Sequence, residues 1–231
     1  MGLKQLREEV LEANLELVRQ NLVVFTFGNA SGFDRESGHA VIKPSGVPYD
    51  KLTPADLVVT DLDGNIVEGT LRPSSDLPTH LALYRAWPGV NGVVHTHSRY
   101  ATAWAQANKD IPCMGTTHAD YMPGPLPVTR PMRKEEIQSS YELNTGHVII
   151  ERFKDLDPLE TSAVLVSGHA PFTWGATVTD AAHTAAVVEE LAHMAFLTFT
   201  INPNAAPISN FLLEKHFYRK HGANAYYGQK K

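Results

Sequence analysis

The chain has 231 residues, of which 43% are hydrophobic and 19% are charged, and this composition is typical of a folded domain that buries its own core. The formal net charge of -5 excludes a general attraction to nucleic acid or to anionic membranes, so any bound anion needs a local site. The single cysteine, Cys113, excludes an intrachain disulfide and fits a reducing compartment, so we expect a cytoplasmic protein.

The N-terminal segment 1–21 is charged throughout and lacks the apolar core of a signal peptide or a membrane span. Its apolar residues recur at three- and four-residue spacing, which is the period of one helix face. The segment therefore predicts an amphipathic helix whose core-facing side is made of Leu3, Leu6, Val10, Ala13 and Leu17.

β-Rich segments broken by turn residues follow, and they cover residues 22–31, 39–46, 56–69 and 92–97. Within the third segment, the sequence DLDGN predicts a hairpin turn. Two helices are predicted among these strands, one over 74–87 with Pro78 in its first turn and one over 98–108.

The remaining predicted elements lie in the last third of the chain. The apolar segment 162–175 predicts a strand that runs into a loop, and residues 179–201 predict a long helix opened by Thr179 or Asp180. A final helix over 210–221 is expected to stop at Gly222. Hairpin strands with segregated helices predict a single α/β domain over 1–231 with antiparallel pairing, not strict βαβ alternation.

The sequence HTH places two histidines one residue apart at the end of an apolar run. Because side chains alternate along a strand, His95 and His97 project to one face, where they could chelate one ion or simply stand half exposed at a strand end. His169, which follows another apolar run, is the best candidate for a third ligand, and three neutral imidazoles are typical of catalytic Zn²⁺ sites. Asp76 is a candidate fourth oxygen ligand or a nearby base.

His183 and His193, both in the predicted long helix, are interpreted as structural, and His39 and His147 are interpreted as solvated. His193 lies three and four residues after Glu190 and Glu189, which is typical of a charge pair on a helix surface. His80 is interpreted as facing the exterior of its helix, whereas His118 in TTHADY is left open.

Polar segments with small residues and free backbone donors are candidate anion sites, namely Gly28 and Asn29, Ser45 and Gly46, and Ser74 and Ser75 at a helix start. A phosphate needs several converging N–H and O–H donors, and a helix N-terminus supplies some of them. Lys43 could add the positive charge. Each segment alone is more often an ordinary turn or cap, whereas together they favour a small phosphorylated ligand. The chain contains no Walker loop and no dinucleotide fingerprint.

Seven motifs follow one another over nearly the whole chain: TFGNAS, IKPSGV, EGTLRPSSDLPTH, VVHTHSRYATAWA, GTTHADY, GHAPFTWG and KHFYRKHGANAYYGQ. Together they resemble the class II aldolase/adducin family. The resemblance implies one three-layer α/β/α domain around a central, mainly antiparallel sheet. It also implies a fourfold-symmetric homotetramer with active sites between subunits, each reached by the C-terminal tail of the neighbouring subunit.

The resemblance also implies roles for individual residues. It implies Zn²⁺, or another divalent cation such as Mn²⁺ or Co²⁺, on His95, His97 and His169 with Asp76 nearby. The implied substrate contacts are Gly28, Asn29, Lys43, Ser45, Gly46, Ser74 and Ser75. Asp120 and Tyr227 correspond to the two acid/base groups of the family, the tyrosine coming from the adjacent subunit. His216 is either a further substrate contact or the cap of a basic helix end.

Within the family, the motifs are most similar to those of its pentulose phosphate epimerases. This similarity implies a small phosphorylated pentulose as substrate, cleaved and rejoined between carbons 3 and 4. The alternative is an aldolase that releases dihydroxyacetone phosphate, although such aldolases usually carry Glu at the position of Asp76. A non-catalytic domain like the adducin head predicts degraded metal ligands, whereas the three histidines are present.

Two questions stay open at this point. The resemblance does not separate a role in L-arabinose use from one in L-ascorbate use. Ala170 follows His169 where relatives usually have Gly, which could alter the geometry at that ligand because alanine has less backbone freedom.

Overall fold

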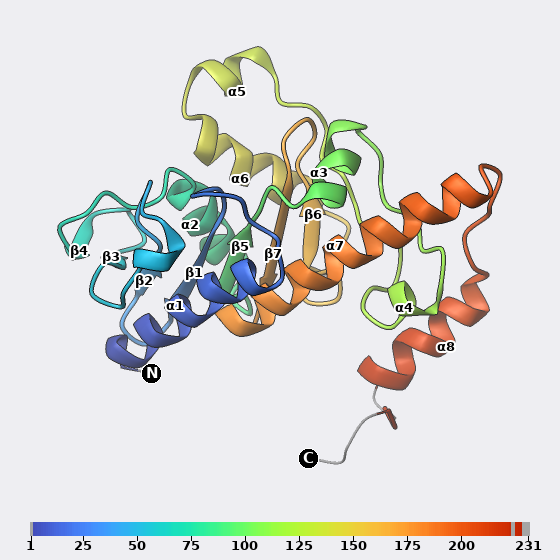
Figure 1. Cartoon of the computed structure of the whole chain (residues 1–231), viewed down its shortest axis with the longest axis horizontal. Coiled ribbons are helices and arrows are strands. Elements are labelled where there is room, and N and C mark those ends of the chain that lie inside the picture. The colour runs from blue at the N-terminus through green and yellow to red at the C-terminus, as the bar shows by residue number, and fades with distance from the viewer. Residues whose placement is uncertain (1, 223–224, 228–231) are drawn as a thin grey trace.

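The computed structural model describes residues 2–222 and 225–227 (Figure 1). At its centre lies a seven-stranded sheet in the order β4-β3-β2-β1-β5-β7-β6, in which all neighbouring strands are antiparallel. The strands are β1 (Asn29–Asp34), β2 (His39–Ile42), β3 (Val58–Thr60), β4 (Ile66–Glu68), β5 (Gly92–His95), β6 (Ala163–Leu165) and β7 (Pro171–Gly175).

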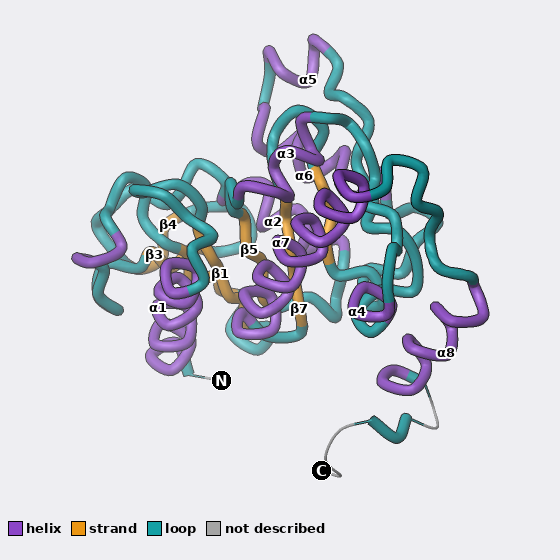
Figure 2. Tube along the Cα trace, turned by 45° about the vertical axis from the view of Figure 1, so that its right-hand side comes forward, coloured by secondary structure: helices purple, strands orange, loops and turns teal. Residues whose placement is uncertain are grey.

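Helices cover both faces of the sheet (Figure 2). They are α1 (Leu3–Arg19), α2 (Leu77–Ala86), α3 (Arg99–Gln106), α4 (Thr116–Ala119), α5 (Lys134–Gln138), α6 (Tyr141–Arg152), α7 (Val178–Ile201) and α8 (Asn210–His221), with a short 3-10 helix at Tyr49–Lys51. α1 and α7 pack on one face of the sheet, and α2 and α6 pack on the other.

Side-chain alternation along the strands divides the core between these two faces. Val41, Val59 and Val94 pack against the apolar side of α1 and the first half of α7. Their neighbours Ile42, Val58 and Val93 point the other way, to α2 and α6. The three-layer fold with a mainly antiparallel sheet is therefore confirmed, as are the predicted α1 face and the turn between β3 and β4.

The N-cap of α7 lies two residues before Thr179, the earlier of the two helix openings predicted from the sequence. This N-cap is Thr177, whose hydroxyl accepts from the Asp180 N–H at 3.1 Å while the Asp180 carboxylate accepts from the Thr177 N–H at 3.1 Å. This capping box satisfies two free donors of the first turn. By length and composition α7 could also cross a membrane, but the core helices of soluble proteins pass the same test.

Turn chemistry explains two further differences from the sequence prediction. The predicted strand over 22–31 begins only at Asn29, because residues 22–28 form a loop in which Phe25 has φ +54°. The segment 162–175 folds into two strands, β6 and β7, instead of a strand and a loop. Gly168, with φ +69°, allows the tight turn between them. The middle of the chain, where no element was predicted, contains α4, α5 and α6.

His80 is fully buried, so its predicted position on the helix exterior is wrong. Its Nδ1 lies 2.7 Å from the Ser31 hydroxyl, which in turn lies 2.6 Å from the Tyr84 hydroxyl. These contacts join α2 to β1 through the interior. Burial lowers the pKa of His80 to about 4, so the ring is neutral at physiological pH.

The buried His80 should make stability pH-dependent. The unfolded chain takes up a proton near the ordinary pKa of 6.5, whereas the folded chain does so only near 4, so the stabilisation is complete above pH 6.5 and is lost towards pH 4. We expect His80→Asn to be less stable than the wild type at neutral pH. The difference in the free energy of unfolding between the wild type and His80→Asn should decrease on acidification by at most about 1.4 kcal/mol per pH unit. Urea unfolding between pH 4 and pH 7 measures this difference. A difference that does not change with pH would contradict a buried, neutral His80.

Candidate active site

Strand direction brings the candidate residues to one edge of the sheet. Because neighbouring strands are antiparallel, the start of β1, the ends of β2 and β5 and the start of β7 lie side by side. Asn29 at the start of β1 pairs with His95 at the end of β5, and His95 pairs with Phe172 in β7. Lys43 directly follows β2, and His169 lies two residues before β7.

The three histidines predicted as ligands lie together at this edge. One ring nitrogen from each of His95, His97 and His169 falls within 4.8 Å of the others. The Nε2 atoms of His95 and His97 are 3.0 Å apart. His95 Nδ1 lies 3.0 Å from the Pro171 carbonyl, which can only accept, so the ring proton sits on Nδ1 and the Nε2 lone pair faces the other histidines.

Burial sets the charge of this cluster. It lowers the pKa of His95 to about 3 and also lowers the pKa of His97 and of His169. All three imidazoles are therefore neutral at physiological pH, which is the form that binds metal ions. The donor set thus fits a single divalent cation.

Asp76 supplies the negative charge beside the histidines. It is the N-cap residue of α2, and its Oδ2 accepts from the Asn29 side-chain amide at 2.7 Å. Burial alone would raise the pKa of Asp76. The nearby His95 and His80, together with the Asn29 hydrogen bond, outweigh burial and hold this pKa below its ordinary value. Asp76 faces the same cavity as the histidines but is not part of their close cluster.

A cavity of about 390 Å³ opens at this edge. It is lined by all the predicted metal ligands and by every predicted substrate contact except His216. It is also lined by residues that sequence reasoning missed, namely Thr26, Phe27, Pro44, Tyr141 and Glu142. The last two begin α6, in the segment for which no element was predicted, so no local pattern marked them.

The substitution of Ala170 for the usual Gly leaves the turn before β7 unstrained. The positive φ in this turn belongs to Gly168, and Ala170 is not among the described residues with positive φ. Ala170 is fully buried, and its carbonyl accepts from the Val166 N–H at 3.0 Å. The residue of this turn with a left-handed backbone is Gly168, which is a glycine, so the alanine at position 170 causes no backbone strain.

Glu189 of α7 supports the segment that carries His97. Its two carboxylate oxygens accept from the N–H groups of Tyr100 and Ala101, at 2.8 and 2.9 Å, in the first turn of α3. His193 stacks on the Tyr100 ring at 3.9 Å between centroids. The predicted surface pair of His193 with a glutamate is therefore wrong, because Glu189 caps α3 instead. No local sequence pattern reveals a cap supplied 88 or 89 residues away.

This cap can be tested with two neighbouring glutamates. Glu189→Gln keeps one acceptor but turns an amide N–H₂ towards the other helix donor, so we expect a loss of about 1–2 kcal/mol in the free energy of unfolding. The exposed Glu190 serves as control, and Glu190→Gln should change stability by less than about 0.5 kcal/mol. Urea unfolding measures both values. Equal stability of the two variants would mean that the cap is energetically unimportant.

The predicted acid/base residues lie outside the cavity and close to each other. Asp120, at the end of α4, accepts from Arg219 at 2.7 Å and from His216 at 3.0 Å, with the Lys220 ammonium at 3.4 Å. The Tyr227 ring lies 4.6 Å from the Arg219 guanidinium carbon. Burial would raise the pKa of Asp120, but its cationic partners together hold it below the ordinary value.

α4 and α8 lie at one end of the molecule, beside the C-terminal half of α7 (Figure 1). Within one chain, the structure therefore brings Asp120, His216 and Tyr227 together on this unit, but not with the three histidines. Of the C-terminal tail predicted to reach a neighbour, residues 223–224 and 228–231 lie outside the described part of the chain.

Comparison with known proteins agrees with this architecture. Residues 8–196 match the family described as the class II aldolase and adducin N-terminal domain. The chain is 55% identical over 228 residues to L-ribulose-5-phosphate 4-epimerase UlaF of Salmonella paratyphi A (strain ATCC 9150 / SARB42), covering 99% of this chain and 100% of that protein.

Solved structures show the same fold. An L-fuculose 1-phosphate aldolase matches with a TM-score of 0.78 and 24% identity, over 92% of this chain and 94% of that one. The L-fuculose-1-phosphate aldolase from Thermus thermophilus matches with a TM-score of 0.68 and 25% identity, over 89% of this chain and 100% of that one. The chain therefore belongs to the class II aldolase and adducin family, as its motifs predicted.

Proposed function

We propose that this chain is an epimerase that interconverts L-ribulose 5-phosphate and D-xylulose 5-phosphate. The observation that carries the proposal is the 55% identity to an L-ribulose-5-phosphate 4-epimerase over the full length of that relative. The cavity with its neutral histidines, the Asp76 carboxylate and Lys43 supplies groups that this reaction needs.

The substrate dictates a carbon–carbon cleavage. Its carbonyl is at carbon 2, so the hydrogen on carbon 4 is not acidic enough for simple removal and return. Deprotonation of the 4-hydroxyl instead breaks the bond between carbons 3 and 4, giving the enediolate of dihydroxyacetone and glycolaldehyde phosphate. Rotation of the aldehyde and re-addition on its other face inverts carbon 4.

We assign the metal site to His95, His97 and His169, with Asp76 beside them. Zn²⁺ suits three imidazoles, and Mn²⁺ or Co²⁺ can occupy the same type of site. A divalent cation there would supply Lewis acidity for the enediolate oxygen atoms. Asp76, held ionised and fixed by Asn29, contributes the negative charge that favours a cation at this place.

The chain's own residues hold the substrate and move its protons. The phosphate is assigned to Lys43 and to the segments of Gly28 and Asn29, Ser45 and Gly46, and Ser74 and Ser75, which keep it anchored while the aldehyde turns. Asp120 and Tyr227 are assigned as the two proton-transfer groups, one for each face of the aldehyde, with His216 as a further substrate contact.

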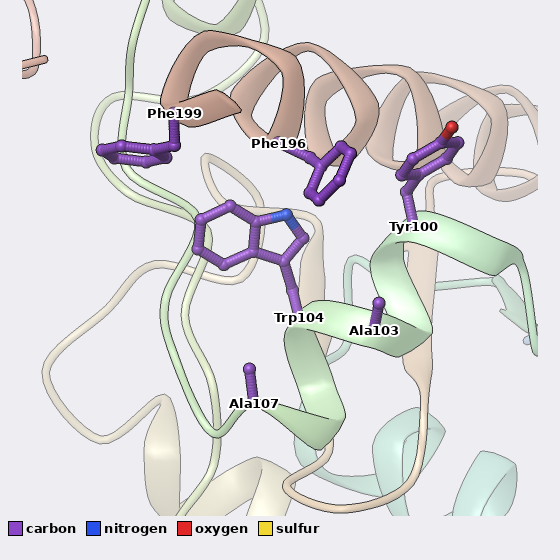
Figure 3. Close-up of a pocket in the computed structure, with 6 residues that line it drawn as sticks. All are labelled: Tyr100, Ala103, Trp104, Ala107, Phe196 and Phe199. Atoms are coloured by element: carbon purple, nitrogen blue, oxygen red, sulfur yellow. The ribbon is translucent and has the colours of Figure 1, made fainter. Parts of the chain in front are cut away.

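Asp120 and Tyr227 meet the histidines only if two chains combine, and we infer a cytoplasmic homotetramer with active sites between subunits. Exposed aromatic surface supports this assembly. Figure 3 shows Trp104 and Tyr100 of α3 facing Phe196 and Phe199 of α7 around an apolar hollow of about 340 Å³. Beside the mouth of the cavity, Phe25 is 81% exposed and Phe27 is 55% exposed.

The reaction itself is tested with purified protein and L-ribulose 5-phosphate. We expect D-xylulose 5-phosphate to form, as monitored by carbon-13 NMR or by a coupled assay for the product. L-Fuculose 1-phosphate is the matching substrate for the competing aldolase activity. Release of dihydroxyacetone phosphate from it, without conversion of L-ribulose 5-phosphate, would support an aldolase and reject the epimerase.

The shared active site is tested by mixing two inactive variants. His97→Asn removes a predicted metal ligand and Tyr227→Phe removes a predicted proton-transfer group. Each variant alone should therefore lose most activity. If each site combines histidines of one subunit with the tyrosine of its neighbour, some sites in mixed tetramers regain both groups and activity returns. Unmixed samples treated identically are the control, and no recovery in tetramers shown to be mixed would contradict the shared site.

A further inference from the structure

Lys43 is a buried cation without a counter-ion in the described part of the chain. It is 2% exposed, and no described carboxylate forms an ion pair with it. Its ammonium has only a 3.4 Å contact with the Pro44 carbonyl and a position 4.7 Å from the centroid of the Tyr49 ring. Since burial lowers the pKa of Lys43, its positive charge depends on favourable contacts such as this aromatic face.

The hydroxyl of the same tyrosine reaches a second wall of the cavity. Tyr49 is only 6% exposed, and its hydroxyl lies 2.9 Å from the carbonyl oxygens of both Phe27 and Gly28. One side chain from the 3-10 helix Tyr49–Lys51 thus touches both the lysine and the glycine turn. Tyr49 itself does not line the cavity.

These hydrogen bonds determine the direction of backbone donors. The carbonyl of Phe27 and the N–H of Gly28 belong to one trans peptide and point in opposite directions. Holding the carbonyl therefore aims the Gly28 N–H away from Tyr49. The turn has little freedom of its own, because Gly28 has φ +75° and a Cβ there would lie 2.8 Å from the His95 carbonyl oxygen.

We propose that Tyr49 is a positioning residue for the substrate phosphate. Its ring holds the Lys43 ammonium and its hydroxyl sets the Gly28 turn, so that a cation and a backbone donor converge on one anion. The inference rests on the proposed function only in identifying this anion as the phosphate of a sugar phosphate. Tyr49 acts through Lys43 and Gly28 and touches no reacting atom.

Two substitutions separate the contributions of the hydroxyl and the ring. Tyr49→Phe removes the hydrogen bonds but keeps the aromatic face, whereas Tyr49→Leu removes both. Tyr84→Phe is the matched control, because Tyr84 is equally buried, has a hydrogen-bonded hydroxyl and does not line the cavity. The readouts are the Kd of inorganic phosphate by titration calorimetry, and KM and kcat for L-ribulose 5-phosphate.

We expect the Kd of phosphate to rise about fivefold in Tyr49→Phe and about thirtyfold or more in Tyr49→Leu. KM should rise in the same order with kcat nearly unchanged, because the phosphate is held equally in the ground and transition states. The control should keep the wild-type Kd. Should Tyr49→Leu fail to fold, Tyr49→Phe decides alone.

An unchanged phosphate Kd in Tyr49→Phe, or a fall in kcat without a rise in KM, would overturn the inference. Its failure is distinguishable from failure of the proposed function. A wild type that binds phosphate but does not convert L-ribulose 5-phosphate rejects the epimerase. A wild type that converts it while the variants bind phosphate normally rejects only the role of Tyr49.

Discussion

The pairing of β5 with β1 on one side and β7 on the other determines where the groups of the site can lie. This register puts Asn29, His95 and Phe172 in one row across three strands. The Phe172 ring stacks on His95 with 4.2 Å between centroids, and the Pro171 carbonyl accepts a hydrogen bond from His95 Nδ1. A slip of one residue would turn His95 to the opposite face of the sheet and remove it from the other two histidines.

Burial at this edge of the sheet also affects the protonation states of the side chains that line the cavity. Desolvation keeps the three imidazoles neutral, while Asp76, whose carboxylate accepts a hydrogen bond from Asn29, stays ionised because its pKa lies below the ordinary value. Lys43 lines the same cavity, and its ammonium lies 4.7 Å from the centroid of the Tyr49 ring. The histidines and Asp76 therefore suit a cation, and Lys43 suits an anion in the same cavity. A sugar phosphate whose oxygens bind a metal ion matches both requirements.

The polar cluster around Asp120 contains the cations Arg219 and Lys220, in contrast to the neutral histidines of the cavity. Asp120 is surrounded by Arg219, Lys220 and His216, so its carboxylate is strongly favoured in the ionised form. Neither Asp120 nor His216 lines the cavity of the three histidines, and Asp120 has cationic partners of its own. The proton transfer that we propose for Asp120 is therefore assigned to a site that an adjacent subunit completes with its histidine cavity.

Local patterns in the sequence predicted the parts of the protein that depend on local physics. The apolar period of residues 3–17 gave the face of α1, and HTH after an apolar run gave two of the three clustered histidines. His169 was predictable because it follows a strand that ends at the same sheet edge. The motifs shared with a known family supplied the order of the layers.

Contacts between distant segments left no local signal. Glu189 caps a helix that begins 90 residues earlier, and Tyr49 holds carbonyls more than 20 residues before it. His80 was misplaced because its partner, Ser31, lies 49 residues away on the neighbouring strand. Each of these polar side chains forms a hydrogen bond with a residue far away in the sequence. The local sequence pattern around the side chain does not indicate such a partner.

The metal site that we assign to His95, His97 and His169 should hold one divalent ion per chain. Metal content after incubation with Zn²⁺ and extensive dialysis tests it most directly, with His97→Asn compared to His147→Asn, whose histidine is exposed on α6. We expect one ion per chain in the wild type and in His147→Asn, and loss of that ion in His97→Asn. Retention of one ion per chain by a folded His97→Asn, with the wild-type affinity, would contradict it.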